Sequence, residues 1–571
     1  IGRSTPASRA PNHTITAIAT TVASNATQPV ATIARRRDTI EGRWRASIEG
    51  TSSGGKVMLA IVGVTRCHLG STPVDGDRIR SLRKEASAVP QFTRLLSPIT
   101  GNDPISGATS LRTRLISRAE REAIGRALRE TRPISELGHW EVVKDRPRPL
   151  DLIEASHVGR VEHLVPIRIA RMIGSPYGFL RGSAVVMADD VARLPVSGIA
   201  PVIGGDAHLG NFGFYRSPEG EQVLDINDFD EAHVGAWEWD VARLTASIWV
   251  AGRENSLTEE DCRTSVLACV RAYRNEVARL AQIPLIARSF ERMDVPHLTE
   301  AASDPGLLAA IDKAAKAARK RTSDRALPKL TGENAQGERE IVAEPPLVER
   351  LDAEGAEQVA QGLDRYLTSL PAQWRRVLAW YQLSDVAHKV VGVGSVGLRA
   401  YVALLEGTHP DDVLFLQLKQ ARRSVVARYV HGEDAWHEHQ GQRVVESQQS
   451  LQTVSDPLLG WTTFGGHQYY VRTFRNMKGT VPLDGLDSTA LADYSHIVGT
   501  LLAKGHARTS GASMIAAYLG DDDAPAEAFA AFARGYADQT EADHTTMLAA
   551  VASGRLPVAE GFTGSAFRPG D

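Results

Sequence analysis

Two polar segments, each directly after a short apolar run, constrain this chain more than any other feature of its sequence. Residues 204–212 contain Asp206 and Asn211, and residues 224–231 contain Asp228. Polar side chains at the ends of strands often form sites, because the strands hold them rigidly while the loops expose them. We therefore expect both segments to follow strands and to contribute to one site.

The residue types in these segments suit phosphoryl transfer. One carboxylate must orient a hydroxyl nucleophile and accept its proton, while an amide oxygen and a second carboxylate hold Mg²⁺ against a triphosphate. We expect Asp206 to be the base, and Asn211 and Asp228 to bind the metal. His208 either contacts phosphate or supports the loop, and support is favoured. The alternative is that these residues only form turns at strand ends.

A glycine-rich loop lies far downstream of these segments. Gly392, Gly394, Ser395 and Gly397 belong to a GxGxxG pattern. The β-branched run before the pattern and the turn-forming residues from Gly407 onward favour a hairpin over the helix that a Rossmann motif requires. In a hairpin, such a loop lets backbone N–H groups cover the phosphates of a nucleotide, because no side chain blocks their approach.

Two charged residues after this loop complete the expected nucleotide site. Lys419 ends the next apolar run, and Glu446 lies on the helix that follows it. We expect Lys419 to bind phosphate and Glu446 to pair with Lys419 and align it. The alternative is an ordinary exposed Lys on an edge strand and an ordinary helical Glu. Arg181, Arg472 and Lys478 are weaker candidates for contact with anionic ligand groups.

The composition excludes several classes of protein. The chain has 571 residues, 43% of them hydrophobic, and a formal net charge of −3, so it can bury a core and has no overall charge that attracts nucleic acid. Its three cysteines form no CxxC pair and no disulfide framework, which indicates the reducing cytoplasm. No run of eighteen apolar residues occurs, so we expect no membrane span. Residues 1–110 are expected to be a leader without a defined fold.

Apolar periodicity predicts many helices and fewer strands. Helices are expected at residues 118–130, 162–172, 237–253, 259–283, 357–381, 440–454 and 491–504 and after Pro525, and strands at residues 199–204, 223–226, 414–418 and 467–473. The basic stretch 312–346 is interpreted as an exposed helix end and a linker, with a substrate-facing segment as the alternative. We expect a helix-rich part at 111–380, a β-rich part at 381–485, and C-terminal helices at 486–571 that pack on the first part.

Several segments resemble known families. Residues 205–211 and 227–230 resemble the catalytic and metal motifs of aminoglycoside phosphotransferases and related kinase-like enzymes. The region from 118 to 536 resembles a bacterial family with a domain of unknown function, number 2252, through its segments 175–182, 205–213, 227–240, 391–399 and 470–479. The resemblance to kinase-like enzymes implies an α+β, protein kinase-like fold with two lobes. It also implies ATP and Mg²⁺ as cofactors, with a small hydroxylated molecule or a protein as the acceptor.

The order of the motifs departs from that of a kinase, in which the glycine loop precedes the catalytic residues. Here Gly392 follows Asp228 at a long distance in the sequence. We therefore expect a circularly permuted fold, which requires Lys419 to lie within ~15 Å of Asp228 because both must reach one triphosphate. Gly204 stands where the phosphotransferases usually have His, and Asp240 is expected to brace this loop.

Three other functions remain open at this point. The same fold transfers AMP to a protein hydroxyl when the nucleotide binds in a flipped pose. A second alternative is a nucleotide-binding module without catalysis, and the intact set of Asp206, Asn211 and Asp228 argues against it. A third is a metal-dependent hydrolase built on His208 and the Asp residues, which needs His and carboxylate ligands that converge on a transition metal.

Overall fold

The computed structural model describes residues 117–390, 392–431, 437–509 and 511–562. Contacts divide the chain after Arg80, and all described residues belong to the second unit. The expected leader at 1–110 lies outside the described residues. Within them, none of the helices combines the length and the apolar character needed to cross a membrane.

The described chain has a mixed α+β fold. Its helices are α2 Arg118–Thr131, α3 Pro149–Ala155, α4 Val165–Ile173, α5 Pro176–Gly182, α6 Ala184–Val191, α7 Trp237–Glu254, α8 Glu259–Gln282, α9 Leu285–Ser289, α10 Val295–Ala301, α11 Pro305–Arg319, α12 Ser323–Leu330, α13 Ala353–Tyr366, α14 Ala372–Leu378, α15 Ala427–His431, α16 Gln440–Leu451, α17 Ser488–Thr509, α18 Ala512–Leu519 and α19 Ala524–Ala552. Its strands are β1 Val202–Ile203, β2 Phe212–Arg216, β3 Gln222–Ile226, β4 His233–Val234, β5 Thr331–Glu333, β6 Arg339–Ile341, β7 Val348–Arg350, β8 Gln382–Lys389, β9 Ala400–Glu406, β10 Val413–Gln420, β11 Gly460–Phe464 and β12 His467–Thr473.

The main sheet has six antiparallel strands in the order β11-β12-β10-β9-β8-β7. Its side chains alternate between two faces, as strand geometry requires. Leu405 and Leu416 pack with α13 on one face, whereas Leu404 and Phe415 pack with α12 and β6 on the other. Lys419 follows Phe415 by four residues in β10, so it lies on the second face.

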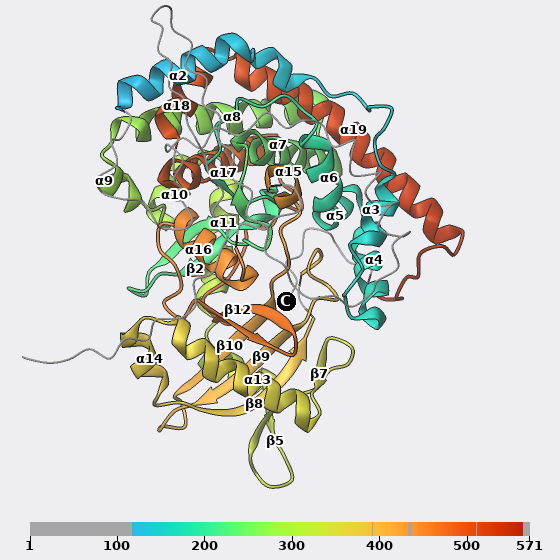
Figure 1. Ribbon diagram of the computed structural model, residues 1–571, viewed down its shortest axis with the longest axis vertical. Helices are drawn as coiled ribbons and strands as arrows, with labels where there is room; N and C mark the ends of the chain where they lie inside the picture. Colours follow the sequence, from blue (N-terminus) through green and yellow to red (C-terminus); the bar gives the residue numbers. More distant parts are fainter. Residues whose placement is uncertain (1–116, 391, 432–436, 510, 563–571) are drawn as a thin grey trace, which may run out of the picture. The chain divides into compact units, whose positions relative to one another are not determined.

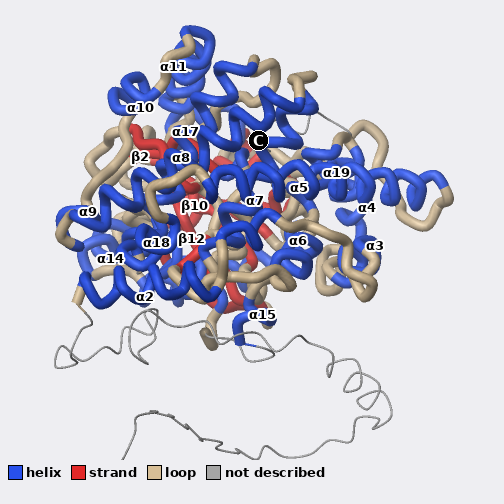
Figure 2. Tube along the Cα trace, turned by 90° about the horizontal axis from the view of Figure 1, so that it is seen from above, coloured by secondary structure: helices blue, strands red, loops and turns tan. Residues whose placement is uncertain are grey.

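Most of the other helices form a second core beside this sheet (Figure 1). In that core α17 packs against α8, and α19 packs against α7, through buried residues such as Trp237, Tyr273 and Phe529. Figure 2 looks onto the helical side, where helices lie over the strands. The short pairs β1–β4 and β2–β3 are set into the helical part and carry the two polar segments.

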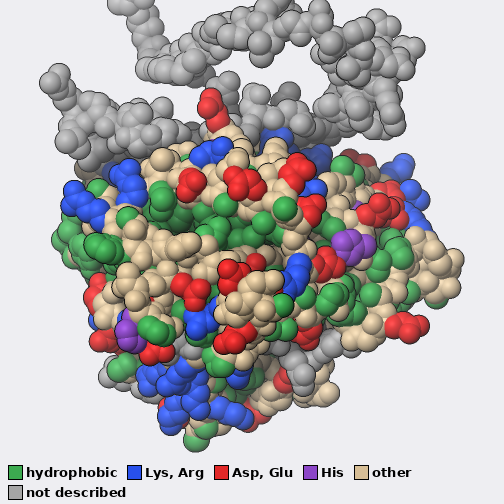
Figure 3. Space-filling model, turned by 90° about the horizontal axis from the view of Figure 1, so that it is seen from below, with side chains coloured by type: hydrophobic (Ala, Val, Ile, Leu, Met, Phe, Trp, Pro, Cys, Tyr) green, Lys and Arg blue, Asp and Glu red, His purple; other side chains and the backbone are tan. Residues whose placement is uncertain are grey.

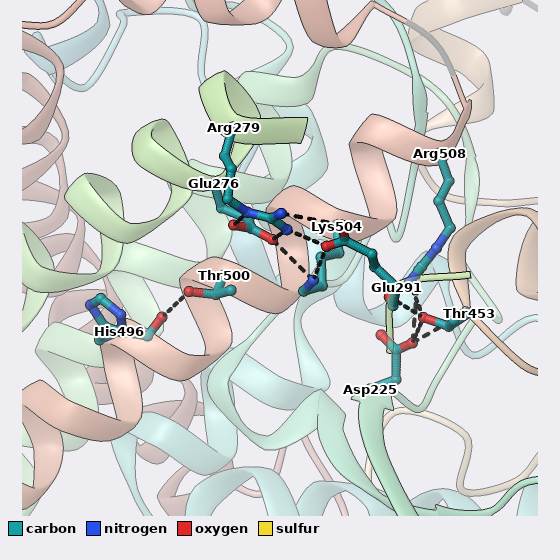
Figure 4. Close-up of polar contacts among 9 residues, drawn as sticks. All are labelled: Asp225, Glu276, Arg279, Glu291, Thr453, His496, Thr500, Lys504 and Arg508. Atoms are coloured by element: carbon teal, nitrogen blue, oxygen red, sulfur yellow. Dashed lines mark hydrogen bonds and ion pairs between the residues drawn. The ribbon is translucent and has the colours of Figure 1, made fainter. Parts of the chain in front are cut away.

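A polar network joins α17 to α8 and to β3 (Figure 4). Lys504 Nζ lies 3.0 Å from Glu276 and 3.3 Å from Glu291, while Arg508 Nη1 lies 3.8 Å from Asp225 of β3. β3 leads directly into the second polar segment. The network therefore connects a C-terminal helix to the strand that positions one half of the expected site.

Most expected elements are present with shifted ends, and two of the differences have a clear physical reason. The helix expected at 357–381 is divided into α13 and α14, because Pro371 lacks the N–H group that a continuous helix would need. The helix expected to end before Gly505 continues to Thr509. A Cβ at Gly505 would lie 3.2 Å from Ile226, so this glycine permits close packing on β3 rather than ending the helix.

The basic stretch 312–346 is more ordered than a linker. It contains the end of α11, all of α12 and the hairpin of β5 and β6. Lys313, Lys316 and Arg319 are exposed on α11, as a solvated face predicts, but Arg321 lines a cavity. Lys and Arg side chains also gather at one edge of the face shown in Figure 3.

Candidate functional site

A cavity of about 460 Å³ lies where the sheet meets the helical part. Most of the candidate residues line it: Asp206, His208, Asn211, Asp228, Gly392, Gly394, Ser395 and Lys419. Its lining is strongly basic, with eleven Arg and Lys residues against four acidic ones. The basic residues are Arg160, Arg168, Arg181, Arg321, Lys419, Arg422, Arg423, Arg428, Arg472, Arg475 and Lys478. Such a cavity attracts an anionic ligand.

The two polar segments are held against each other through their main chains. The N–H of Asn227 donates to the carbonyl of Asn211 over 2.9 Å. Gly205 has a φ of 72°, and a Cβ at this position would lie 2.2 Å from the carbonyl oxygen of Glu231. A glycine is therefore required here by both the backbone conformation and the close approach of the second segment.

Asp206 pairs with a buried arginine of α7. Arg243 Nη2 lies 2.6 Å from Asp206 Oδ1, and its Nε donates to the same oxygen over 2.8 Å. Burial raises the pKa of Asp206 to about 7, although the charge of Arg243 opposes this shift. A carboxyl group with a pKa near neutrality is well matched to accepting a proton from a substrate hydroxyl.

His208 and Asn211 shape the loop that carries Asp206. His208 Nδ1 accepts a hydrogen bond from the N–H of Gly210 over 3.1 Å, and burial, reinforced by Arg181 and Arg243, holds its pKa well below the usual value. The imidazole is therefore neutral and supports the loop, as expected. Asn211 Nδ2 donates to the carbonyl of Asp206 over 2.8 Å, which leaves Asn211 Oδ1 available as an acceptor.

Lys419 lies beside the carboxylates of the second segment. Its Nζ is 2.6 Å from Asp230 Oδ2 and 3.8 Å from Asp228 Oδ1. Although burial opposes it, the charges of Asp228 and Asp230 raise the pKa of Lys419 above its usual value. Burial acts to raise the pKa of Asp230, but Lys419 and a hydrogen bond from Tyr470 outweigh it and lower that pKa.

Asp228 and Asp230 differ in how many of their acceptor positions are already occupied by protein groups. Asp230 accepts from Lys419, from the hydroxyl of Tyr470 over 2.9 Å and from Ser395 Oγ over 3.0 Å. The side chain of Asp228 is 38% exposed, and one of its oxygens accepts the N–H of Asp230 over 3.3 Å. Asp228 is therefore the carboxylate with room for a further ligand.

The glycine-rich loop connects β8 and β9, which pair as an antiparallel hairpin, in agreement with the expectation from sequence. Gly392 and Gly397 have φ values of 70° and 84°. The loop is also held at both ends, because Arg171 donates to the carbonyl of Gly392 and Arg160 Nη1 donates to that of Val396 over 2.6 Å. This loop covers the cavity next to Asp230.

The expected ion pair between Glu446 and Lys419 is absent. Glu446 lies on α16 as predicted, but its carboxylate is 3.0 Å from His437 Nε2 and accepts from Gln442 over 2.7 Å. The side chain that α16 directs to the site is instead Arg443, which donates to the carbonyls of Asp230 and Arg422 over 2.7 and 2.9 Å. Lys419 is aligned by Asp228 and Asp230.

Asp240 braces the first polar segment, as expected. It is 1% exposed on α7 and accepts from the N–H groups of Gly204 and Gly205 over 2.6 and 2.9 Å. His506 Nε2 of α17 lies 3.2 Å from the same carboxylate, and Tyr273 contacts the other ring nitrogen over 2.8 Å. His506 of α17 therefore supports this loop through Asp240.

In the described part of the chain, no three His, Cys, Asp or Glu side chains lie together in a way that would hold a metal ion. The metal-hydrolase alternative therefore lacks a ligand set there. A Mg²⁺ ion needs less from the protein, because it keeps several waters and binds one or two carboxylates together with substrate phosphates. Asp228 and the Oδ1 of Asn211 offer such oxygen ligands.

One family model matches residues 160–550, and its description is "Uncharacterized protein conserved in bacteria (DUF2252)". The match covers more than half of the chain. The chain belongs to this family. Comparison with curated proteins and with solved structures gave no match.

The region matched by this family contains every candidate residue named above, and also residues that the sequence analysis missed. Arg243, Tyr470 and Arg443 all contact the acidic residues of the site or their main chain. An Arg at position 243, three residues after Asp240 on a largely apolar helix, was a signal for a buried ion pair. Tyr470 and Arg443 gave no comparable signal, because their orientation depends on how β12 and α16 pack.

Proposed function

We propose that the protein transfers the γ-phosphoryl group of ATP, with Mg²⁺, to a hydroxyl group of a small molecule. The observation that carries this proposal is the position of Lys419, 3.8 Å from Asp228 and 2.6 Å from Asp230, in a cavity that also contains Asp206. An ammonium group, a metal-binding carboxylate and a basic carboxylate within one cavity are the parts that phosphoryl transfer requires.

The order of elements around the cavity supports a circularly permuted kinase-like fold. A glycine loop joins β8 and β9, Lys419 follows on β10, and α16 comes after the short α15, which resembles the order of these parts in a kinase. The permuted connection requires α17 to end where the first polar segment begins. Thr509 Oγ1 accepts from the N–H of Val202 over 3.1 Å, which supports this connection.

Each residue has a defined role in the proposed reaction. Bound ATP would supply the electrophilic phosphoryl group, and Mg²⁺ would offset the negative charge that develops on it. Asp228 and Asn211 Oδ1 would hold the metal, and Lys419 would bind a phosphate oxygen. Asp206 would orient the acceptor hydroxyl and accept its proton, while Arg243 keeps this carboxylate in place. The hydroxyl oxygen forms a bond to the γ-phosphorus as the bond to the β-phosphate oxygen breaks and ADP leaves.

Thermal unfolding with and without ATP and Mg²⁺ tests the nucleotide site. We expect ATP with Mg²⁺ to stabilise the wild type, by about 2.7 kcal/mol at a hundredfold excess over its dissociation constant. Asp228→Ala is expected to lose most of this effect, because it removes the carboxylate with room for the metal. Asp312→Ala on exposed α11 is the control and is expected to respond like the wild type. No shift with any nucleotide, in protein shown to be folded, would contradict the proposal.

The raised pKa of Asp206 predicts a pH dependence. Since the base must be deprotonated, kcat/KM is expected to rise with pH and to level off above about 7.

The same raised pKa predicts that stability changes with pH in the opposite direction. The protonated carboxyl of Asp206 is favoured in the folded protein, so its contribution to the free energy of unfolding is present at low pH and is lost as the pH rises to about 7. Thermal midpoints of the wild type and Asp206→Asn between pH 4 and 8 would show this slope only in the wild type. Equal slopes would contradict it.

The mass of the product distinguishes phosphoryl transfer from AMP transfer to a protein. An acceptor heavier by one phosphoryl group, with ADP as the second product, supports the proposal. A protein substrate that gains AMP, with release of diphosphate, would show that the nucleotide binds in the reverse orientation.

A further inference from the structure

Three arginines at one end of the cavity contact neutral groups. Arg168 is 2% exposed; its Nη2 donates to the carbonyl of Gly182 over 2.8 Å, and its Nε and Nη1 are buried with no hydrogen-bond partner. Arg160 donates to the carbonyls of Ser156 and Val396 over 3.0 and 2.6 Å. Arg422 donates to the carbonyl of Ser156 over 3.1 Å. Among the residues that the structure describes, none of the three has a carboxylate within ion-pair distance.

These arginines also repel one another. Burial, followed by the charge of Arg422, lowers the pKa of Arg160 to about 10. Burial, followed by the charges of Arg160 and Arg422, holds the pKa of Arg168 well below its usual value. A buried charge is costly unless it is paired. Arg146 illustrates the usual pairing of a buried charge, since its guanidinium lies 2.7 Å from both Asp190 and Asp543.

Two of the three arginines, Arg160 and Arg168, lie in the segment around α4, beside the arginine that pairs with Asp206, while Arg422 follows β10. Arg168 contacts Gly182 at the end of α5, and Arg243, the partner of Asp206, donates to the carbonyl of Leu180 in the same helix over 2.7 Å. Helices α3 to α6 group together (Figure 1).

We propose that the acceptor carries an anionic group, phosphate or carboxylate, which Arg160, Arg168 and Arg422 bind while its hydroxyl is oriented by Asp206. This inference rests on the proposed function. The planar guanidinium groups match both anions, because each presents two parallel N–H donors to a pair of oxygens. In Arg168, Nε and Nη1 keep N–H groups without a partner, one on each edge of the guanidinium, and an anion can accept from them.

Inorganic phosphate and citrate are separate probes for this site. In thermal unfolding, at least one of them is expected to raise the midpoint of the wild type, and the response identifies phosphate or carboxylate as the group. The shift is expected to persist with a saturating non-hydrolysable ATP analogue and Mg²⁺. Arg168→Met is expected to lose the anion shift but keep the nucleotide shift, and its midpoint without ligand should not fall, because an unpaired buried charge is removed.

Two further variants keep the result interpretable. Arg422→Met changes a partly exposed arginine of the same cluster and is expected to weaken the anion shift without affecting folding. Arg319→Met, on exposed α11, is the matched control and should respond like the wild type.

Once an acceptor is identified, turnover provides a second test. Alcohols that carry a phosphate or carboxylate should be phosphorylated, and their neutral analogues should not. Arg168→Met should raise KM for the anionic acceptor at least tenfold with less effect on kcat.

The outcomes separate the two proposals. An anion shift that the ATP analogue abolishes would show that the arginines hold the triphosphate and would overturn the inference, as would an anion shift retained in Arg168→Met or the absence of any anion shift. An anion shift that depends on Arg168 in a protein that binds no nucleotide would overturn the proposed function and leave the anion site standing.

Discussion

Replacing Asp206 by asparagine is expected to lower the rate of phosphoryl transfer by about 10²–10⁴-fold, the usual contribution of a general base. Asparagine has nearly the same shape, and its Oδ1 can still accept from Arg243, but it cannot take the proton of the acceptor hydroxyl. The measurement is single-turnover formation of ADP and phosphorylated product at saturating ATP and Mg²⁺.

Binding must be separated from chemistry in this variant. The shift in thermal midpoint with ATP and Mg²⁺ is expected to equal that of the wild type, because Asp228, Asn211 and Lys419 are unchanged. Asp312→Asn, which alters an exposed side chain of α11, is the control and should keep the full rate. An Asp206→Asn variant that retains the wild-type rate would assign the proton transfer to another group and contradict the proposed role.

The sequence was sufficient to predict which short segments contribute residues to the site. The polar segments follow short apolar runs, so Asp206, Asn211 and Asp228 are placed at strand ends by patterns that extend over only a few residues. The hairpin around the glycine loop and the strand that ends at Lys419 were predictable for the same reason. The permutation hypothesis required Lys419 to lie within ~15 Å of Asp228, and the observed 3.8 Å meets this requirement, but no pattern between the two segments predicted the contact.

The partner of Lys419 was not predictable, because it depends on how a helix is rotated about its axis. Apolar periodicity placed Glu446 on α16 correctly. The rotation of that helix is set by its packing on β12, where a Cβ at Gly441 would lie 2.2 Å from the carbonyl of Tyr469. With this face against the sheet, Arg443 reaches the site, and Glu446 contacts His437 instead.

The arginine cluster shows a second limit of sequence reasoning. Arg160 and Arg168 precede the first polar segment by about forty residues, and Arg422 follows the sheet strand that carries Lys419. Each is an ordinary residue in its own segment. Only the fold reveals that they approach one another and that, among the described residues, none of them has a carboxylate within ion-pair distance. This unpaired charge is what indicates the chemistry of a ligand.

Replacing Asp240 by alanine is expected to lower the free energy of unfolding by about 3 kcal/mol or more. The carboxylate is buried and accepts two main-chain N–H groups, from Gly204 and Gly205, as well as contacting His506. Alanine leaves these groups without an acceptor in a site closed to water, and each unsatisfied buried donor costs about 1–3 kcal/mol. Urea unfolding followed by circular dichroism measures the change.

The same variant tests whether α17 and the first polar segment act as one structure, as the permuted connection requires. Asp312→Ala removes a carboxylate that forms an exposed pair with Lys316, so it controls for loss of charge and should change stability by less than about 1 kcal/mol. His506→Ala removes the contacts of α17 with both Asp240 and Tyr273, but the two glycine N–H groups keep their acceptor, so the first polar segment should be disturbed less than in Asp240→Ala. If Asp240→Ala unfolds at the wild-type urea concentration, Asp240 does not brace the loop, and Asp206 must be positioned by Arg243 and Asn211 alone.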